Sequence, residues 1–173
     1  MKEENNFNIF IIGIGNENRK DDAIGIKVIS VLEKMALSGV QLIKIQDDIT
    51  DLLNLWANAR LVILIDAVIS DNPPGTIIRI DANDLSSFKS IKTTSTHSLS
   101  IINLIQLAKI LGTLPEKLIF YGIEIKNKDL GFGIDEKVEK SIKKLVSQIL
   151  LEINQISYSS LKPKGWLFVS HMP

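Results

Sequence analysis

The chain has 173 residues, 45% of them hydrophobic, which is enough for the core of one domain of ordinary size. Lysine plus arginine and aspartate plus glutamate number 20 each, so no basic excess is available to hold a nucleic-acid backbone. The absence of cysteine excludes disulfides and thiolate metal ligands. Residues 1–10 lack the apolar segment of a signal peptide or membrane span, so we expect a soluble, cytoplasmic protein.

Short apolar runs alternate with segments of helical period in the first half of the chain. An isoleucine-rich run at 7–15 that ends in glycines predicts a buried strand. From Asp22 to about Leu37, apolar residues recur at helical spacing and predict a helix. The residues expected on its buried face are Ile24, Val28, Leu32 and Met35. A second strand is expected at 40–45 and a short helix at 49–59.

The second half continues this alternation. Residues 60–68 are apolar over five positions before Asp66, which is typical of a central strand buried on both faces. An edge strand is expected at 76–81, and a helix, apolar nearly all round and capped by Gly112, at 97–112. A last strand at 116–125 precedes a helix that Asp135 is expected to cap. Its apolar stripe consists of Val138, Ile142, Leu145, Val146, Ile149 and Leu150.

This order of elements predicts an α/β fold with three layers, in which a mostly parallel sheet carries helices on both faces. We expect one domain at 1–154 and a tail of unknown role at 155–173. Ligands of such sheets gather at the carboxyl ends of the strands, so the residues that directly follow the apolar runs are the candidates for a site.

Two glycines and two aspartates follow the first predicted strand. Gly13 and Gly15 begin a dinucleotide fingerprint, but Asn18 stands where the third glycine is required, and the aspartates would repel a pyrophosphate. Close approach of another backbone is a sufficient reason for the glycines. Asp21 and Asp22 could simply cap a helix, but one cap needs one aspartate.

Two further candidates lie at later junctions. Asp66 follows an apolar strand, where an ionised carboxylate needs a partner, either the amides of a following turn or a functional group. His97 begins a predicted helix, whose dipole favours the neutral imidazole that coordinates cations. If Asp22, Asp66 and His97 converge, their oxygen and nitrogen donors suit nickel, zinc, manganese or iron.

Four motifs in consistent order resemble the hydrogenase maturation endopeptidases, which process the large subunit of nickel-iron hydrogenases. They are "GIGNENRKDDAIGIKV", "LIDAV", "STHSLS" and "GFGIDEKV", and the similarity runs from about Ile9 to Leu150. The resemblance implies a twisted, mostly parallel five-stranded sheet flanked by helices. It also implies an endopeptidase that removes the C-terminal extension of the large-subunit precursor after nickel insertion.

The resemblance places the metal-binding and catalytic triad on Asp22, Asp66 and His97. The nickel then belongs to the substrate and serves for recognition, so no tightly bound intrinsic metal is expected. Water is the expected nucleophile, since no nucleophilic cysteine or serine elbow is present. The turn of Gly13, Gly15 and Asn16 is a candidate for contact with the substrate peptide or its oxyanion.

Two alternatives use the same residues. A stand-alone metallopeptidase would hold its own catalytic ion and cut generic peptides. A non-enzymatic, nickel-sensing docking module or chaperone would bind immature hydrogenase and leave its length unchanged. In each case we expect no nucleic-acid or membrane partner, and a monomer is adequate for a peptidase whose partner is a large precursor.

Overall fold

A computed structural model describes residues 8–46, 49–57, 59–84, 88, 96–126 and 129–161, without the side chains of residues 96–100 and 157–161. Five strands form one sheet: β1 (Ile9–Ile14), β2 (Val40–Ile45), β3 (Leu61–Val68), β4 (Ile77–Asp81) and β5 (Lys117–Glu124). The helices in these ranges are the 3-10 helix η1 (Lys20–Ala23) and α1 (Ile24–Glu33), α2 (Leu52–Trp56), α3 (Thr96–Leu111) and α4 (Glu136–Leu161).

The strands lie in the order β2-β1-β3-β5-β4. All neighbouring pairs are parallel except β4 and β5, which are antiparallel at one edge. β3 is the central strand, and each of its residues is buried. In the register, Gly13 lies opposite Ile65, and Asp66 lies opposite Gly122. The predicted mostly parallel five-stranded sheet is therefore confirmed, and β1, β3 and β5 end at the same edge of it.

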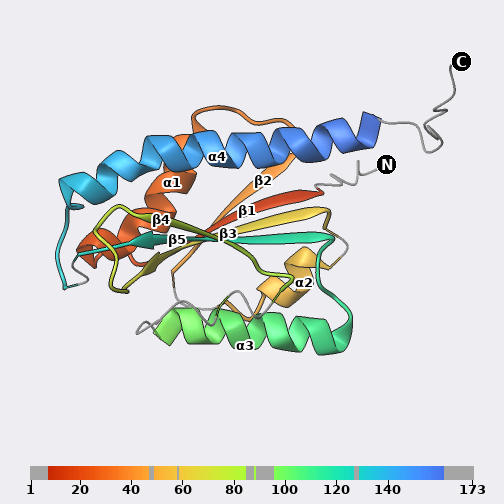
Figure 1. Cartoon of the computed structure of the whole chain (residues 1–173), viewed down its shortest axis with the longest axis horizontal. Helices are drawn as coiled ribbons and strands as arrows, with labels where there is room; N and C mark the ends of the chain where they lie inside the picture. The colour runs from red at the N-terminus through yellow and green to blue at the C-terminus, as the bar shows by residue number, and fades with distance from the viewer. Residues whose placement is uncertain are drawn as a thin grey trace, which may run out of the picture.

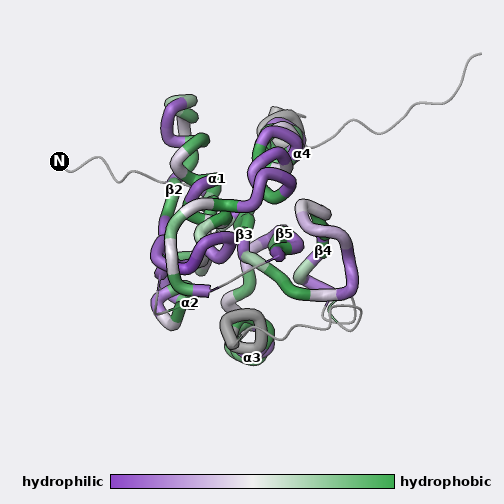
Figure 2. The backbone as a smooth tube through the Cα atoms, turned by 90° about the vertical axis from the view of Figure 1, so that its left-hand side faces the viewer, coloured by the Kyte–Doolittle hydropathy of each residue, from purple (hydrophilic) through white to green (hydrophobic). Residues whose placement is uncertain are grey.

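Helices cover both faces of the sheet. Figure 1 shows α1 and α4 on one side and α2 and α3 on the other, and the turned view of Figure 2 shows the sheet between α4 and α3. A hydrophobic core lies on each face of the sheet, and alternate residues of β3 pack into one or the other. Val62 and Leu64 pack in the α3 layer, and Ile63 and Ile65 pack in the α1 and α4 layer. This period of two follows from the pleat of a strand. The predicted three-layer α/β fold is confirmed.

The first helix differs from the prediction at both ends. It begins with η1, so Asp22 lies in a 3-10 turn, and α1 ends at Glu33 rather than near Leu37. Met35 is 46% exposed, so the prediction that it lies on the buried face of the helix is wrong. The amides of Met35 and Ala36 close tight turns onto residues 32 and 33, and Ala36 has a φ of +48°. The chain therefore leaves the helical path before Met35 can face the core.

The two long helices also show what periodicity alone missed. Gly112 ends α3 with a φ of +67°, as predicted. However, the outer face of α3 is exposed, with Ile110 at 81%, so the helix is buried on one side only. Asp135 caps α4 as predicted, because its Oδ1 accepts the amide of Lys137 at 2.9 Å. α4 continues to Leu161, and Ile156 packs against the core.

An ion-pair network around one buried carboxylate joins α4 to the sheet. Glu152 accepts hydrogen bonds from Arg79 of β4 and Lys117 of β5, each at 2.7 Å, and is itself 6% exposed. Burial alone raises the pKa of Glu152, but hydrogen bonds and Coulomb attraction from Arg79 and Lys117 outweigh it, so the pKa lies below its ordinary 4.5.

In the described part of the chain, no helix has the length and apolar content needed to cross a bilayer.

We expect Glu152→Gln to lower the free energy of unfolding at pH 7 by about 1–3 kcal/mol, because two cations lose a buried anion. A carboxylate with a depressed folded-state pKa stabilises the fold above its unfolded pKa, and this stability is lost as pH falls through the folded value. The gap between variant and wild type should therefore close below about pH 4.5. Urea unfolding between pH 3 and 7 measures it.

Glu136→Gln is the matched control, since Glu136 pairs with Lys140 on the exposed surface of α4. Its expected effect is within about 0.5 kcal/mol. Equal unfolding midpoints for Glu152→Gln and the wild type at pH 7 would contradict the proposed contribution of the network.

Candidate active site

The turn from β1 into α1 packs with almost no space between backbones. A Cβ atom on Gly15 would lie 2.1 Å from the carbonyl oxygen of Asp22, and one on Gly13 would lie 2.3 Å from that of Gly25. A Cβ atom on Gly25 would lie 2.2 Å from the carbonyl oxygen of Ile14. Real Cβ atoms essentially never approach within 3.0 Å, so each position requires glycine. The close-approach explanation for these glycines is confirmed.

The same packing fixes the position of Asp22. Asp22 lies in η1, one turn before Gly25, and its amide donates to the carbonyl of Arg19 at 2.8 Å. A Cβ atom on Gly25 would also lie 2.7 Å from the carbonyl oxygen of Ile65, the residue before Asp66. The backbones that carry the two predicted carboxylates therefore meet at the ends of β1 and β3.

The structure separates the roles of the two adjacent aspartates. Asp21 is 2% exposed, and its carboxylate accepts the amide of Asp135 at 2.6 Å and the amide of Lys126 at 3.1 Å. It thus ties η1 to the segment between β5 and α4, and the interpretation of Asp21 as a helix cap is wrong. Asp22 is partly exposed, and within the described residues its carboxylate forms no hydrogen bond. Asp22 is therefore the member of the pair that is available to a ligand.

Asp21→Ala is expected to lower the free energy of unfolding by about 2–4 kcal/mol, because it leaves two part-buried amides without their acceptor. Asp22→Ala serves as the matched control and should leave the unfolding midpoint close to that of the wild type. Chemical denaturation of both variants measures the difference. A larger loss of stability from Asp22→Ala than from Asp21→Ala would reverse this assignment.

Asp66 occupies the sixth of the eight positions of β3 and is 2% exposed. Its Oδ1 accepts the amide of Ala67 at 2.8 Å. Val62, Leu64 and Val68 all pack in the α3 layer, so the alternation of the strand places Asp66 on that same side. Asp66 therefore lies near the carboxyl end of the central strand, on the face that α3 covers.

His97 lies in the first turn of α3, and its side chain is outside the described residues. After α3, the chain enters β5 at Lys117, which lies opposite Leu61 at the start of β3. α3 thus runs back from the carboxyl edge of the sheet to the amino edge, and its first turn lies at the carboxyl edge (Figure 1). The backbone places His97 at the edge that carries Asp22 and Asp66.

Among the described side chains, no group of three histidine, cysteine, aspartate or glutamate residues is arranged to hold a metal ion. The side chain of His97 does not belong to that set, and a ligand set that includes it therefore stays a prediction.

A further buried carboxylate at this edge was missed by the sequence analysis. Glu124 ends β5 and is 2% exposed, and it accepts hydrogen bonds from the amide of Ser70 at 2.7 Å and from its hydroxyl at 2.5 Å. Phe120 packs in the α3 layer, so Glu124, four residues further on, lies on the face of Asp66. Because Ser70 engages both carboxylate oxygens, Glu124 fixes the segment that follows β3.

The turn predicted to contact substrate uses its own amides internally. The amide of Gly15 donates to the carbonyl of Ile45 at 3.1 Å, and the amide of Asn16 donates to the carbonyl of Asp22 at 3.3 Å. Gly13 belongs to β1 between two paired strands. This geometry does not support the predicted oxyanion role, because Gly15 and Asn16 use their N–H groups to hold the turn and Asp22 together.

The β1 turn and the central strand each carry a carboxylate at the carboxyl edge of the mostly parallel sheet, which is where open α/β sheets bind their ligands. The model of the hydrogenase maturation protease family matches residues 26–152. The chain therefore belongs to the hydrogenase maturation protease family, whose members are peptidases.

Individual relatives agree with this assignment. The chain is 32% identical over 156 residues to a putative hydrogenase maturation protease of Methanocaldococcus jannaschii, covering 85% of this chain and 97% of the relative. It is 26% identical over 145 residues to the hydrogenase expression/formation protein HupD of Thiocapsa roseopersicina, covering 82% of this chain and 66% of that protein. The hydrogenase maturating endopeptidase HybD from Escherichia coli superposes with a TM-score of 0.76 at 25% identity, covering 85% of this chain and 92% of HybD.

Proposed function

We propose that this peptidase removes the C-terminal extension of a nickel-iron hydrogenase large-subunit precursor after nickel has been inserted. The observation that carries the proposal is the backbone contact of Gly25 with Ile65, which brings η1 and its Asp22 to the strand end that holds Asp66. A carboxylate pair at the carboxyl edge of the central strand is positioned for a substrate that binds across that edge.

In this proposal, the nickel is part of the substrate. Asp22, Asp66 and His97 offer two oxygen donors and one nitrogen donor, a mixed set that suits nickel. By contacting the nickel, the three side chains would dock the adjacent scissile bond at the strand ends. A precursor without nickel would lack this anchor, so cleavage would follow metal insertion.

Water is the proposed nucleophile, and one of the two carboxylates is its general base. The carboxylate takes a proton from the water while the water oxygen bonds to the scissile carbonyl carbon. The carbon–nitrogen bond then breaks, and the proton passes to the leaving amine. Asp66 is the better candidate for the base, because it is buried near the end of the central strand, and charges interact more strongly at a buried site than in bulk water. The cytoplasmic location and the monomeric state stay predictions.

Mass spectrometry of the precursor's C-terminus tests the proposal. The purified protein is mixed with nickel-loaded and nickel-free precursor of the hydrogenase large subunit from the same organism. A single cut in the nickel-loaded sample alone is the expected result. Binding without any cut would favour a docking module, and chelator-sensitive cleavage of generic peptides would favour a stand-alone metallopeptidase.

A further inference from the structure

The 3-10 turn η1, which carries Asp22, has a strained backbone. Lys20, its first residue, has a φ of +39°, a conformation that residues other than glycine rarely adopt. Within the described residues, the side chain of Arg19, which precedes the turn, forms no capping hydrogen bond. A strained backbone persists only where contacts from the rest of the fold fix it. The conformation of η1 therefore depends on its tertiary partners.

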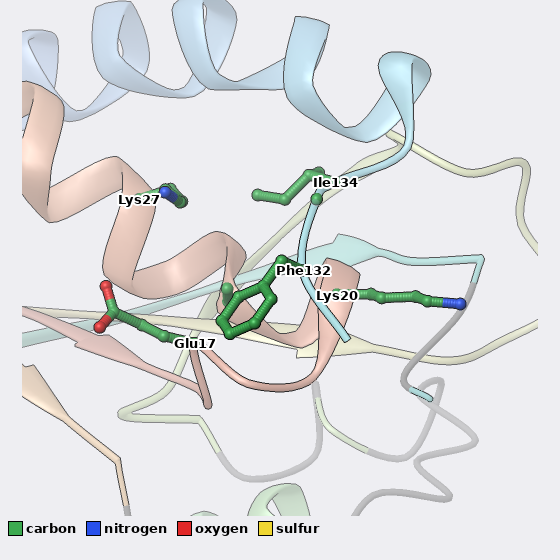
Figure 3. Close-up of a pocket in the computed structure, with 7 residues that line it drawn as sticks. Glu17, Lys20, Lys27, Phe132 and Ile134 are labelled. Atoms are coloured by element: carbon green, nitrogen blue, oxygen red, sulfur yellow. The ribbon is translucent and has the colours of Figure 1, made fainter. Parts of the chain in front are cut away.

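Backbone hydrogen bonds join this turn to the segment between β5 and α4. The amide of Lys20 donates to the carbonyl of Gly131, and the amide of Gly131 donates to the carbonyl of Asn18, each at 2.9 Å. In Figure 3, the loop that carries Phe132 runs beside the turn that carries Lys20, and both residues line one cavity. The segment before α4 is thus the nearest support of the strained residue.

The carboxylate of Asp21 binds both ends of the same segment. Its Oδ2 accepts the amide of Lys126, just after β5, and its Oδ1 accepts the amide of Asp135, just before α4. Asp21 is 2% exposed, so these hydrogen bonds are shielded from water. Each oxygen serves a different amide, and asparagine has only one acceptor oxygen, so the two bonds require a carboxylate. Asp21 therefore fixes η1 relative to β5 and α4.

The contacts that hold η1 also hold the backbone of Asp22, which directly follows Asp21. The amide of Asp22 donates to the carbonyl of Arg19 at 2.8 Å, and the carbonyl of Asp22 accepts the amide of Asn16 at 3.3 Å. Gly15 packs against the same carbonyl, because a Cβ atom on it would lie 2.1 Å from the oxygen. A displacement of η1 would therefore carry Asp22 with it.

We propose that Asp21 is a positioning residue of the active site, which holds Asp22 where it meets the substrate. The inference rests on the proposed function and deepens it, because it names the group that sets the position of a proposed catalytic carboxylate. Asp21 is buried against two backbone amides, so it acts through Asp22 and not on the substrate itself. Misplacement of a reacting group by about 1 Å lowers a rate about a hundredfold, so this position matters for catalysis as well as for stability.

Asp21→Asn tests the inference in the full chain with the nickel-loaded precursor. Asparagine keeps the size of the side chain, but one of the two amides loses its acceptor. We expect the single-turnover cleavage rate to fall about 30- to 100-fold, because η1 shifts. Asp21→Glu is the second variant. It keeps both acceptor oxygens but adds one methylene group, so it should also displace η1 and lower the rate.

Glu152→Gln is the matched control for loss of stability. It also removes a buried carboxylate, but Glu152 binds Lys117 at the start of β5, at the other end of the strand. We expect its cleavage rate to stay within about twofold of the wild type under conditions where the protein is folded. Equal rates for Asp21→Asn and Glu152→Gln would leave Asp21 with a purely structural role and overturn the inference.

A double-mutant cycle shows whether Asp21 acts through Asp22. Asp21→Asn should raise the Kd of the nickel-loaded precursor about tenfold when Asp22 is present. In the Asp22→Ala background it should change this Kd less than about twofold, because the side chain that Asp21 positions is already gone. The same factor in both backgrounds would show an effect that does not pass through Asp22, and would overturn the inference.

Amide hydrogen exchange tests the inference without any substrate, and so separates it from the proposed function. The amides of Asn16 and Asp22 form the bonds of the turn. In Asp21→Asn, we expect their exchange to accelerate about tenfold more than that of the β3 amides, whereas Glu152→Gln should affect both groups equally. Equal acceleration in Asp21→Asn would overturn the inference. If the wild type does not cut the nickel-loaded precursor, the proposed function fails, and hydrogen exchange still decides whether Asp21 holds Asp22.

Discussion

Replacing Asp66 with asparagine is expected to reduce the rate of precursor cleavage by about a thousandfold while the protein stays folded. Asparagine has the shape of aspartate, and its carbonyl oxygen can still accept the amide of Ala67, which donates to Asp66 at 2.8 Å. What is lost is the charge, and with it the proposed nickel ligand and the proposed general base. Single-turnover cleavage, read by mass spectrometry, measures the rate, and circular dichroism checks the fold.

Glu124→Gln is the control for a buried carboxylate at the same edge and on the same face. Glu124 binds Ser70 rather than a proposed ligand, so the folded variant should keep most of its activity. The pair of variants separates loss of chemistry from loss of local structure. Wild-type cleavage by Asp66→Asn would remove Asp66 from the catalytic group.

Gly25→Ala is expected to lower the free energy of unfolding by about 3–5 kcal/mol, or to prevent folding altogether. The sign of this effect is informative, because helix propensity alone predicts that alanine gains about 1 kcal/mol over glycine inside a helix. The new methyl group would lie 2.2 Å from the carbonyl oxygen of Ile14 and 2.7 Å from that of Ile65. These atoms belong to β1 and β3, so neither can yield without moving the sheet.

Gly112→Ala provides the comparison for Gly25→Ala. A Cβ atom on Gly112 would meet no described atom within 4 Å, but the φ of +67° at this position disfavours alanine. The expected cost is about 1–2 kcal/mol from backbone strain alone. Urea unfolding of the two variants compares the free energy lost to a steric collision at Gly25 with that lost to a strained dihedral angle at Gly112. An increase in stability for Gly25→Ala would contradict the packing described above.

Hydrophobic periodicity alone was sufficient to predict the layers of this protein. The apolar runs before Gly13 and Asp66 have the composition of strands that are buried on both faces. Strands of this kind occur in parallel sheets that helices cover on both sides. The stripe of α4 and the caps at Gly112 and Asp135 are local signals, readable within a few residues. Where periodicity failed, at Met35 and on the outer face of α3, the path of the chain decided burial.

The four motifs were also sufficient to predict the family, and the match of the family model to residues 26–152 confirms that prediction. The resemblance placed the metal-binding role on Asp22, but the sequence did not reveal the structural role of Asp21. Only the folded chain shows that role, because the amides that bind Asp21 belong to Lys126 and Asp135, more than a hundred residues away. The same holds for Glu124, whose partner Ser70 lies on another segment of the sheet edge.

Local pattern and residue type were enough to specify the fold class, the family and the candidate residues Asp22, Asp66 and His97. Long-range packing settled why Gly25 must be glycine, why Asp21 is structural, and which loop lies beside η1, since the amide of Lys20 donates to the carbonyl of Gly131. These features depend on contacts between segments distant in the chain. Such contacts arise only when strand ends, turns and loops are packed within van der Waals distance at one edge of the sheet.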